Sequence, residues 1–443
     1  MSTIGILMLP ETSGLNATLA LAKTLQQRGH RVRYLVTQKF KEHLNRQGFE
    51  CSLFALPKRD KHWTDKLPVL GFLRTDALYR NHIAAAFDAW LEQERPDAVL
   101  VDPVMWYVLD GALRRGMPVM SLSPTLASHF SWDVPPLFSR RNPAPGTPGT
   151  GERLRNLWAW MHEGAHGWML GGLNHLLAAF GHDGLGRLRA AGGRMRWGDF
   201  GHRPDLPELV ISPRELDFEA ARALPERHYL GTCVDAQRQD TTFDWSWYDP
   251  AKPLAYCSLG TFVSAFPRAP AFFQAVIDAF RHREDWQLVI SCGPLVEKLG
   301  QQPLPPSIRL MKSVPQLELL ERSRLFLTHA GIGSVREALF YGVPMLAFPV
   351  GGDQFGLAAR VAHHKLGLVG DFHKADARTV GSLVDTLLGQ ADIAASVQRM
   401  RRACQTQHEL AACAALIEQH LQNARPTLEE DGPRPAAAKT SVG

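Results

Sequence analysis

The sequence predicts an α/β protein built from two doubly wound domains of parallel sheet. Short apolar runs, typical of buried parallel strands, recur through both halves of the chain and alternate with segments of helical period. A polar segment, residues 234–250, separates the two alternating patterns as a linker would. The 443 residues suffice for about two to three domains.

In the first half, apolar runs predict six strands, at residues 4–9, 32–36, 49–54, 98–101, 119–122 and 205–211. Helical spacing predicts helices at residues 16–28, 78–93, 109–115 and 153–194. A loop rich in proline and glycine covers residues 133–152. This order is typical of a doubly wound sheet.

The second half repeats the alternation. We expect strands at residues 254–258, 287–291, 308–311, 325–328 and 345–348, and closing helices at 381–389 and 393–421. The tail from residue 424 is rich in Pro, Ala, Glu and Gly, a composition that favours disorder.

Bulk composition excludes several classes of protein. The net charge of +5 is mild, and the sequence has no arginine-rich arm and no basic-aromatic repeat, so we do not expect it to bind nucleic acid. The six cysteines include no CxxC pair and no metal-ligand spacing, so we expect reduced thiols of a cytoplasmic protein. The first residues are typical of a strand rather than a signal peptide, and no apolar run reaches membrane-spanning length.

Residues 313–354 hold the most informative pattern. A buried run, residues 324–328, leads into His329, Gly331 and Gly333, and Ser334 with Glu337 has the spacing of a capping box. A strand, a glycine turn and a helix N-terminus form an anion site, where His329 could donate a hydrogen bond to phosphate. The simpler interpretation is a structural βαβ unit, since two glycines alone are a weak signal and Arg336 stands where a dinucleotide fingerprint has its third glycine.

Taken together, this segment resembles the donor signature of the family 1, UDP-glycosyltransferase-like enzymes, whose fold is called GT-B, in their bacterial macrolide-glycosyltransferase-like branch. The resemblance covers roughly residues 3–420 and is strong only in the second half. The matching residues are Pro315, Gln316, His329, Gly331, Gly333, Ser334, Glu337, Gly342, Val343, Pro344, Pro349, Asp353 and Gln354.

The resemblance implies a role for each residue. His329, the Gly331 and Gly333 backbone and Ser334 would contact the diphosphate, and Glu337 would hold the ribose in competition with its capping role. Gln316 and the Val314 backbone would face the base, and Asp353 and Gln354 would bind the sugar hydroxyls. Residues 257–261 match the family's Ser-Leu-Gly-Thr loop, which brings Thr261 toward the phosphates; an ordinary strand-to-helix turn is the alternative.

Two positions depart from the family pattern. Ser313 replaces an aromatic residue that stacks on the base in many relatives. Serine cannot stack, which leaves the affinity for the base and the choice of base open. Gly356 stands where relatives usually have asparagine. No Asp-x-Asp occurs, and the resemblance implies metal-independent catalysis without a cofactor.

The family's catalytic base is also replaced. Its Gly-His-x-Asn motif corresponds here to residues 13–16, so Gly14 stands in place of the histidine. Three side chains are candidate substitutes: Asp102, which follows a strand where the family has the orienting aspartate, Glu11 of the same loop, and His129 of a later loop. Each also has an ordinary structural interpretation, and an acidic acceptor would need no protein base.

Aromatic residues that follow strand ends suggest an acceptor pocket for an apolar aglycone; they are Trp106, Tyr107, Phe130 and Trp132. Core packing is the alternative for aromatic residues of this half, and the tryptophan-rich residues 158–180 leave peripheral membrane contact open.

We therefore expect an inverting hexosyltransferase that moves a hexose, glucose first, from a UDP- or dTDP-sugar to a small, largely apolar acceptor. The lost histidine keeps open a non-catalytic sugar-nucleotide-binding partner protein, and a GT-B nucleotide-sugar epimerase is a third alternative. The expected division is an acceptor domain at 1–233, the linker at 234–250, a donor domain at 251–404, a helix at 405–423 crossing back to the first domain, and the tail at 424–443.

Overall fold

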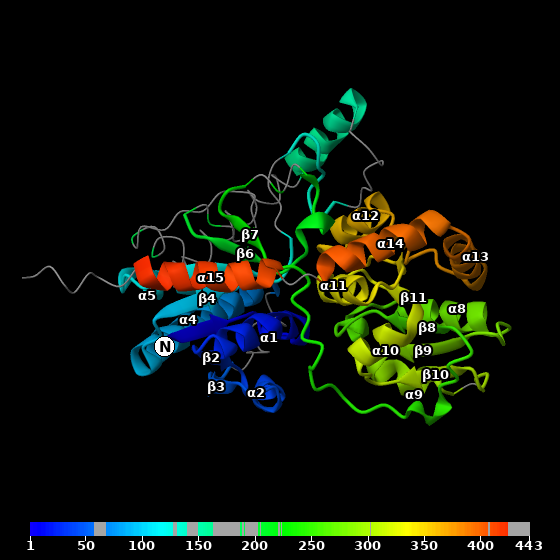
Figure 1. Ribbon diagram of the computed structural model, residues 1–443, viewed down its shortest axis with the longest axis horizontal. Coiled ribbons are helices and arrows are strands. Elements are labelled where there is room, and N and C mark those ends of the chain that lie inside the picture. Colours follow the sequence, from blue (N-terminus) through cyan, green and yellow to red (C-terminus); the bar gives the residue numbers. More distant parts are fainter. Residues whose placement is uncertain are drawn as a thin grey trace, which may run out of the picture.

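The computed structural model describes residues 1–56, 68–126, 131–139, 149–162, 187, 190, 203, 205–219, 222, 224–301, 303–405 and 408–423, with the backbone alone over 68–76. Its described strands form two parallel sheets, one of seven strands and one of six, that lie side by side (Figure 1). The predicted α/β class with two Rossmann-like domains is confirmed.

The first sheet has the order β3-β2-β1-β4-β5-β6-β7. Its strands are β1 (Thr3–Leu7), β2 (Arg31–Val36), β3 (Glu50–Leu53), β4 (Ala98–Val101), β5 (Val119–Ser123), β6 (Glu208–Val210) and β7 (Arg227–Tyr229). Its α-helices are α1 (Thr12–Gln27), α2 (Gln38–Arg46), α4 (Pro68–Glu94) and α5 (Leu109–Arg114). Two 3₁₀ helices, η1 (Pro103–Val108) and η2 (Arg214–Leu216), and a helix over 150–162 complete it.

The second sheet has the order β10-β9-β8-β11-β12-β13. Its strands are β8 (Leu254–Ser258), β9 (Gln287–Ser291), β10 (Ile308–Met311), β11 (Ser323–Thr328), β12 (Met345–Ala347) and β13 (Gly367–Val369). Its α-helices are α8 (Ala269–Phe280), α9 (Val296–Leu299), α10 (Gln316–Arg322), α11 (Ile332–Tyr341), α12 (Gln354–His363), α13 (Ala377–Leu388) and α14 (Ala391–Cys404). The 3₁₀ helices are η4 (Trp245–Trp247), η5 (Val263–Ala265) and η6 (Gly293–Leu295).

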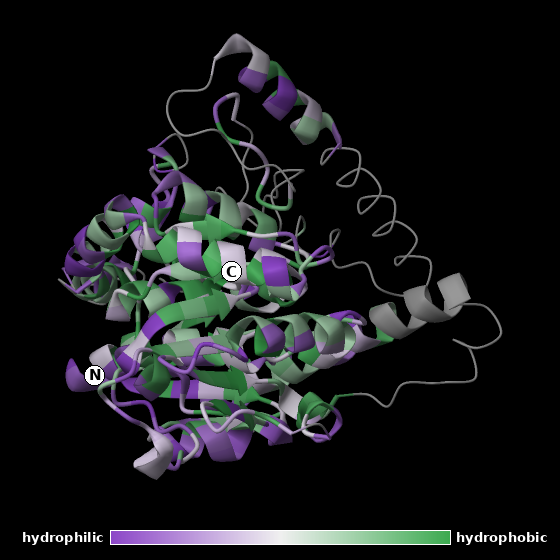
Figure 2. Cartoon of the chain, turned by 90° about the vertical axis from the view of Figure 1, so that its right-hand side faces the viewer, coloured by the Kyte–Doolittle hydropathy of each residue, from purple (hydrophilic) through white to green (hydrophobic). Residues whose placement is uncertain are grey.

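Helices cover both sheets, so the central strands are apolar along their whole length rather than alternating. Every residue of β4 and of β8 is buried. In Figure 2 the strands are mostly green, while purple residues gather on the outer helices and loops. This burial explains why short apolar runs predicted the central strands well.

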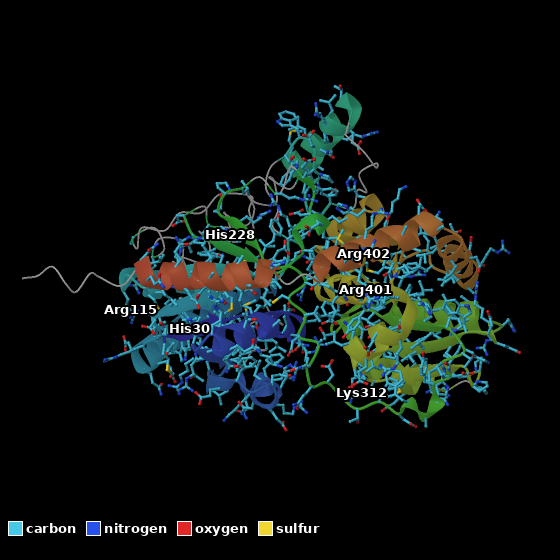
Figure 3. The ribbon with its side chains drawn as sticks, in the orientation of Figure 1. His30, Arg115, His228, Lys312, Arg401 and Arg402 are labelled. Carbon is cyan, nitrogen blue, oxygen red and sulfur yellow. The ribbon has the colours of Figure 1, made fainter. Side chains whose placement is uncertain are left out.

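The last described helix, α15 (His408–Asn423), lies against α1 and β7 of the first sheet (Figure 1). Its Leu410 and Ile417 belong to the same buried cluster as the strands of that sheet. Glu418 accepts two hydrogen bonds from Arg28, and its carboxylate lies 3.1 Å from Nε2 of His30, which is labelled in Figure 3. The C-terminal helix is thus attached to the N-terminal sheet by packing and by charge.

A buried ion pair joins the two halves. Arg360 of α12 donates two hydrogen bonds, of 3.0 and 2.6 Å, to Asp217, which follows η2 of the first half. Asp217 is fully buried and also accepts a hydrogen bond from Tyr229. Because Arg360 and Arg227 are close, the pKa of Asp217 is held below its ordinary value despite burial.

Several helix predictions are wrong in their limits. The helix predicted over 78–93 begins at Pro68, and the one predicted at 381–389 begins at Ala377. The first helix begins at Thr12, not at residue 16, so Ser13 and Gly14 lie in its first turn. The single closing helix predicted over 393–421 is two helices, α14 and α15.

No described helix is long and apolar enough to cross a membrane. Five of the six cysteines are buried thiols and Cys51 is half-buried.

Candidate donor and acceptor site

The predicted donor loop is a strained turn between β11 and α11. After β11 ends at Thr328, Ala330 adopts a left-handed conformation with φ of 61°, which costs free energy for a residue with a side chain. Gly331 is the N-cap of α11. The predicted capping box is therefore wrong: the helix begins a turn earlier than Ser334, which lies buried in the first turn, and no side chain caps it. The first amides of α11 remain available to an anion.

His329 lies between two glycines. A Cβ atom at Gly260 would lie 2.8 Å from the His329 Nε2 atom, and one at Gly331 would lie 2.5 Å from it. The buried Nδ1 atom has no hydrogen-bond partner among the described residues. Burial lowers the pKa of His329 to about 4, against a smaller opposing effect of the nearby Ser258 backbone, so the imidazole is neutral at pH 7.

Thr261 completes this corner from the second glycine loop. It is exposed and directly follows Gly260, whose φ of 76° and contact with His329 both favour glycine. Gly260 donates a hydrogen bond to the Ser258 hydroxyl at 3.2 Å. The two predicted phosphate loops, around 260 and around 331, therefore meet at the His329 ring.

Glu337, the predicted ribose ligand, is the centre of a buried polar chain. One of its carboxylate oxygens accepts a hydrogen bond from Arg238 at 2.7 Å, and the other accepts one from the Gln316 amide at 2.7 Å. Gln316 in turn accepts a hydrogen bond from the Tyr256 hydroxyl at 3.0 Å. Val314 lies half-buried beside this chain, two residues before the first turn of α10. The predicted ribose and base residues are thus brought together.

The residues predicted to bind the sugar lie where the two halves meet. The Asp353 carboxylate, just before α12, accepts a 2.6 Å hydrogen bond from the Thr125 hydroxyl, which follows β5 of the first sheet. The side-chain oxygen of Gln354 accepts hydrogen bonds from the Val350 and Gly351 amides, so its NH₂ group is the part that can donate to a ligand. A Cβ atom at Gly333 would lie 3.8 Å from the Ser13 Cβ atom. The first turn of α11 therefore faces the first turn of α1 at van der Waals distance.

The glycine at 356 has a packing reason. Its amide donates a 2.9 Å hydrogen bond to the Leu137 carbonyl, which belongs to the first half. A Cβ atom at this position would lie 2.4 Å from that oxygen. The asparagine of relatives would not fit against this loop, so Gly356 permits a close contact between the halves.

The three candidate bases differ in their surroundings. Asp102 is 1% exposed, and its two oxygens accept backbone hydrogen bonds from Val104 at 3.0 Å and Leu9 at 3.2 Å. Burial, opposed by these two amides, raises the pKa of Asp102 to about 6. Glu11 is half-buried at the N-cap of α1, and its pKa is raised by burial and by Asp353, with Ser13 opposing. His129 lies outside the described residues.

The aromatic residues predicted for the acceptor fall into three groups. Trp106 and Tyr107 are 7% and 6% exposed and belong to a packed cluster with α4, as the core-packing alternative predicted. Trp132 is 51% exposed. Phe130 lies outside the described residues. Of the four, Trp132 presents its ring to solvent in the described part of the chain.

Sequence reasoning missed Arg238 and Thr125. Arg238 lies in the predicted linker yet has a 5% exposed side chain that pairs with Glu337 and Asp240. The linker backbone at Gln239 exchanges two hydrogen bonds with the Gln47 amide of the first half. A lone arginine between polar residues gave no signal, because its partner stands 99 residues away.

Comparisons with known proteins show which proteins the chain is similar to. Residues 285–417 match the family model for the C-terminal domain of erythromycin biosynthesis protein CIII-like proteins. The chain is 29% identical to oleandomycin glycosyltransferase from Streptomyces antibioticus, in an alignment that covers 97% of this chain and 93% of that protein. It is 27% identical to demethyllactenocin mycarosyltransferase from Streptomyces fradiae, over 94% of this chain and 86% of that protein.

A solved structure, the glycosyltransferase of kitacinnamycin, superposes with a TM-score of 0.70 at 23% identity over 95% of this chain and 99% of that one. This likeness establishes the fold. In sequence and fold the chain is related to the macrolide glycosyltransferases of Streptomyces, family 1 enzymes with the GT-B fold.

Proposed function

We propose that this protein is an inverting glycosyltransferase that moves a hexose, glucose first, from a UDP- or dTDP-sugar to a small, largely apolar natural-product acceptor. The observation that carries this proposal is His329. Its ring lies against Gly260 and Gly331 beside the N-terminus of α11, and its buried Nδ1 atom has no hydrogen-bond partner among the described residues. A diphosphate suits such a site, because helix amides and an N–H donor both stabilise negative charge.

The other predicted donor residues supply groups for the rest of a nucleotide sugar. Glu337 and Gln316 offer acceptor and donor groups to ribose and base, in the roles the family resemblance implies. Asp353 and Gln354 offer acceptor and donor groups to the sugar where the two halves of the chain meet. The relatives named above act on demethyllactenocin and oleandomycin, which supports an aglycone of natural-product type.

The test is transfer by the purified protein from UDP-glucose, dTDP-glucose and dTDP-6-deoxyhexoses to a panel of macrolide and polyphenol aglycones, followed by mass spectrometry. We expect a glycoside with at least one pair and a large loss of rate with His329→Ala. Gly351→Ala is a matched control, because nothing lies within 4 Å of the added Cβ. No glycoside from any pair would contradict the proposal.

One observation favours a second candidate, a non-catalytic partner protein that holds a sugar nucleotide. The family's histidine is replaced by Gly14, which lies buried in the first turn of α1. On this alternative the protein binds UDP or dTDP and transfers nothing, and Gly14→His creates activity where there was none. Turnover by the wild type rejects it.

A further inference from the structure

Gly14 leaves a space, and the Glu11 carboxyl group lies beside it. A Cβ atom built on Gly14 would lie 3.6 Å from the Glu11 Cγ atom and 3.7 Å from its Oε1 atom, with the Leu9 carbonyl next at 3.8 Å. These are ordinary van der Waals distances. A side chain leaving position 14 in this direction would therefore meet the Glu11 carboxyl group, which puts an acid where the family resemblance implies an imidazole.

The same carboxyl group faces the donor half of the chain. Asp353 is close enough for its charge to raise the pKa of Glu11, and Ser13, which hydrogen-bonds to Glu11, lies opposite Gly333. Asp353 is also the residue held by Thr125 from the first sheet. Glu11 thus lies on the acceptor half, directly across from the loop proposed to hold the sugar.

Asp102 holds the Glu11 loop in place. Its Oδ2 atom accepts the Leu9 amide hydrogen, and the Leu9 carbonyl accepts the Glu11 amide hydrogen at 2.7 Å. With both oxygens bonded to backbone amides and 1% exposure, Asp102 has no free face for an acceptor hydroxyl. It is a positioning residue for the loop, and Glu11 is the half-buried carboxylate at its end.

We propose that Glu11 is the general base of the transfer reaction and replaces the histidine that Gly14 lacks. The inference rests on the proposed function. Glu11 takes the proton of the acceptor hydroxyl as its oxygen forms a bond to the anomeric carbon. The bond from that carbon to the β-phosphate oxygen breaks, and the nucleoside diphosphate leaves with the electron pair. The protonated Glu11 then releases its proton to water.

The surroundings make this carboxylate a better base than an exposed one. Burial and the negative charge of Asp353 both raise the pKa of Glu11, and only the Ser13 hydrogen bond opposes them. Asp102 is the second carboxyl group close by, and its charge interacts with that of Glu11. A raised pKa brings a general base nearer to the operating pH, where proton transfer is most effective.

The experiment compares wild type with Glu11→Gln, and with the exposed Glu42→Gln as a matched control. For an acceptor with an alcohol or weakly acidic phenol, we expect kcat to fall about 10²- to 10⁴-fold in Glu11→Gln, the range of general-base catalysis. Donor KM and UDP or dTDP binding should stay within about threefold, because Glu11 is not part of the phosphate or ribose site. With a 4-nitrophenol acceptor, already ionised near pH 7, the loss should shrink to about tenfold or less, which a merely structural role would not produce.

A double variant tests the shared space independently. Glu11→Ala removes the carboxyl group, and adding Gly14→His places an imidazole beside the vacated volume. We expect kcat of the double variant to be at least about tenfold higher than kcat of Glu11→Ala, since the helical backbone at 14 accepts a side chain.

The outcomes separate the two claims. If the wild type transfers sugar and Glu11→Gln keeps its kcat, or loses it equally for acidic and weakly acidic acceptors, the base assignment is wrong and the proposed function stands. If the wild type transfers nothing to any acceptor, both fail. Loss of nucleotide binding in Glu11→Gln would also overturn the assignment, because it would place the residue in the donor site.

Discussion

Replacing Gly331 with alanine is the most discriminating perturbation of the phosphate site. Its φ of −64° suits any residue, so the backbone tolerates the change and the effect comes from the added methyl group alone. That methyl carbon would lie 2.5 Å from the His329 Nε2 atom and 2.9 Å from its Cε1 atom, roughly 1 Å inside van der Waals contact. The imidazole must therefore move away from its place between the two glycine loops.

The expected magnitude follows from the bond that is lost. A hydrogen bond to a charged group contributes about 1.5–3 kcal/mol, so the dissociation constant for UDP or dTDP should rise roughly 10- to 150-fold. The overpacking itself should lower the free energy of unfolding by about 1–3 kcal/mol. Both effects come from one methyl group at one position.

Isothermal titration calorimetry with each nucleoside diphosphate measures the affinity, and urea unfolding measures the stability. His329→Ala sets the expected size of the loss, and Gly351→Ala, in the same half with open space around it, should leave both quantities unchanged. A Gly331→Ala protein that stays folded and binds nucleotide as tightly as the wild type would refute the placement of phosphate beside His329.

Three further predictions concern the contacts between the halves and the proposed base. As the pH is lowered, kcat/KM should fall with an apparent pKa above the ordinary value of 4.5 for glutamate, because Glu11 acts when deprotonated. Glu11→Gln should abolish this fall, and its persistence would assign the fall to another group. Arg360→Met should lower the free energy of unfolding by about 3–5 kcal/mol, since it removes a partner from the fully buried Asp217; urea unfolding with an effect below about 1 kcal/mol would argue against the ion pair. Gly356→Asn should push the Leu137 loop away and lower stability by about 1–3 kcal/mol, measured in the same way, whereas an unchanged midpoint would show that the halves need no close contact there.

Much of the fold could be predicted from sequence because its central strands are buried on both faces. The run at 98–101 is apolar throughout, the run at 254–258 is buried throughout and ends in a serine, and each coincides with a strand of the structure. Helix limits were harder. The first helix begins at Thr12, after a Glu11 N-cap whose side chain makes no capping hydrogen bond, so no strong local signal marked its start.

The site was predicted less completely, because long-range partners decide it. Ser334 and Glu337 have capping-box spacing, yet Glu337 is bound by Arg238 and Gln316, which stand 99 and 21 residues away. Trp106 suggested an acceptor pocket by following a strand end, but the packing of α4 buries it. Side-chain type and spacing predicted the donor loop, and tertiary contacts determined what each residue touches.

The most direct test of the central claim is a donor-consumption assay with and without acceptor, read by NMR. The account predicts that nucleoside diphosphate and glycoside appear in equal amounts, that both require the acceptor, and that the anomeric configuration is inverted. Sugar-nucleotide conversion without acceptor, as an epimerase would give, or tight nucleotide binding with no consumption under any condition, would contradict it.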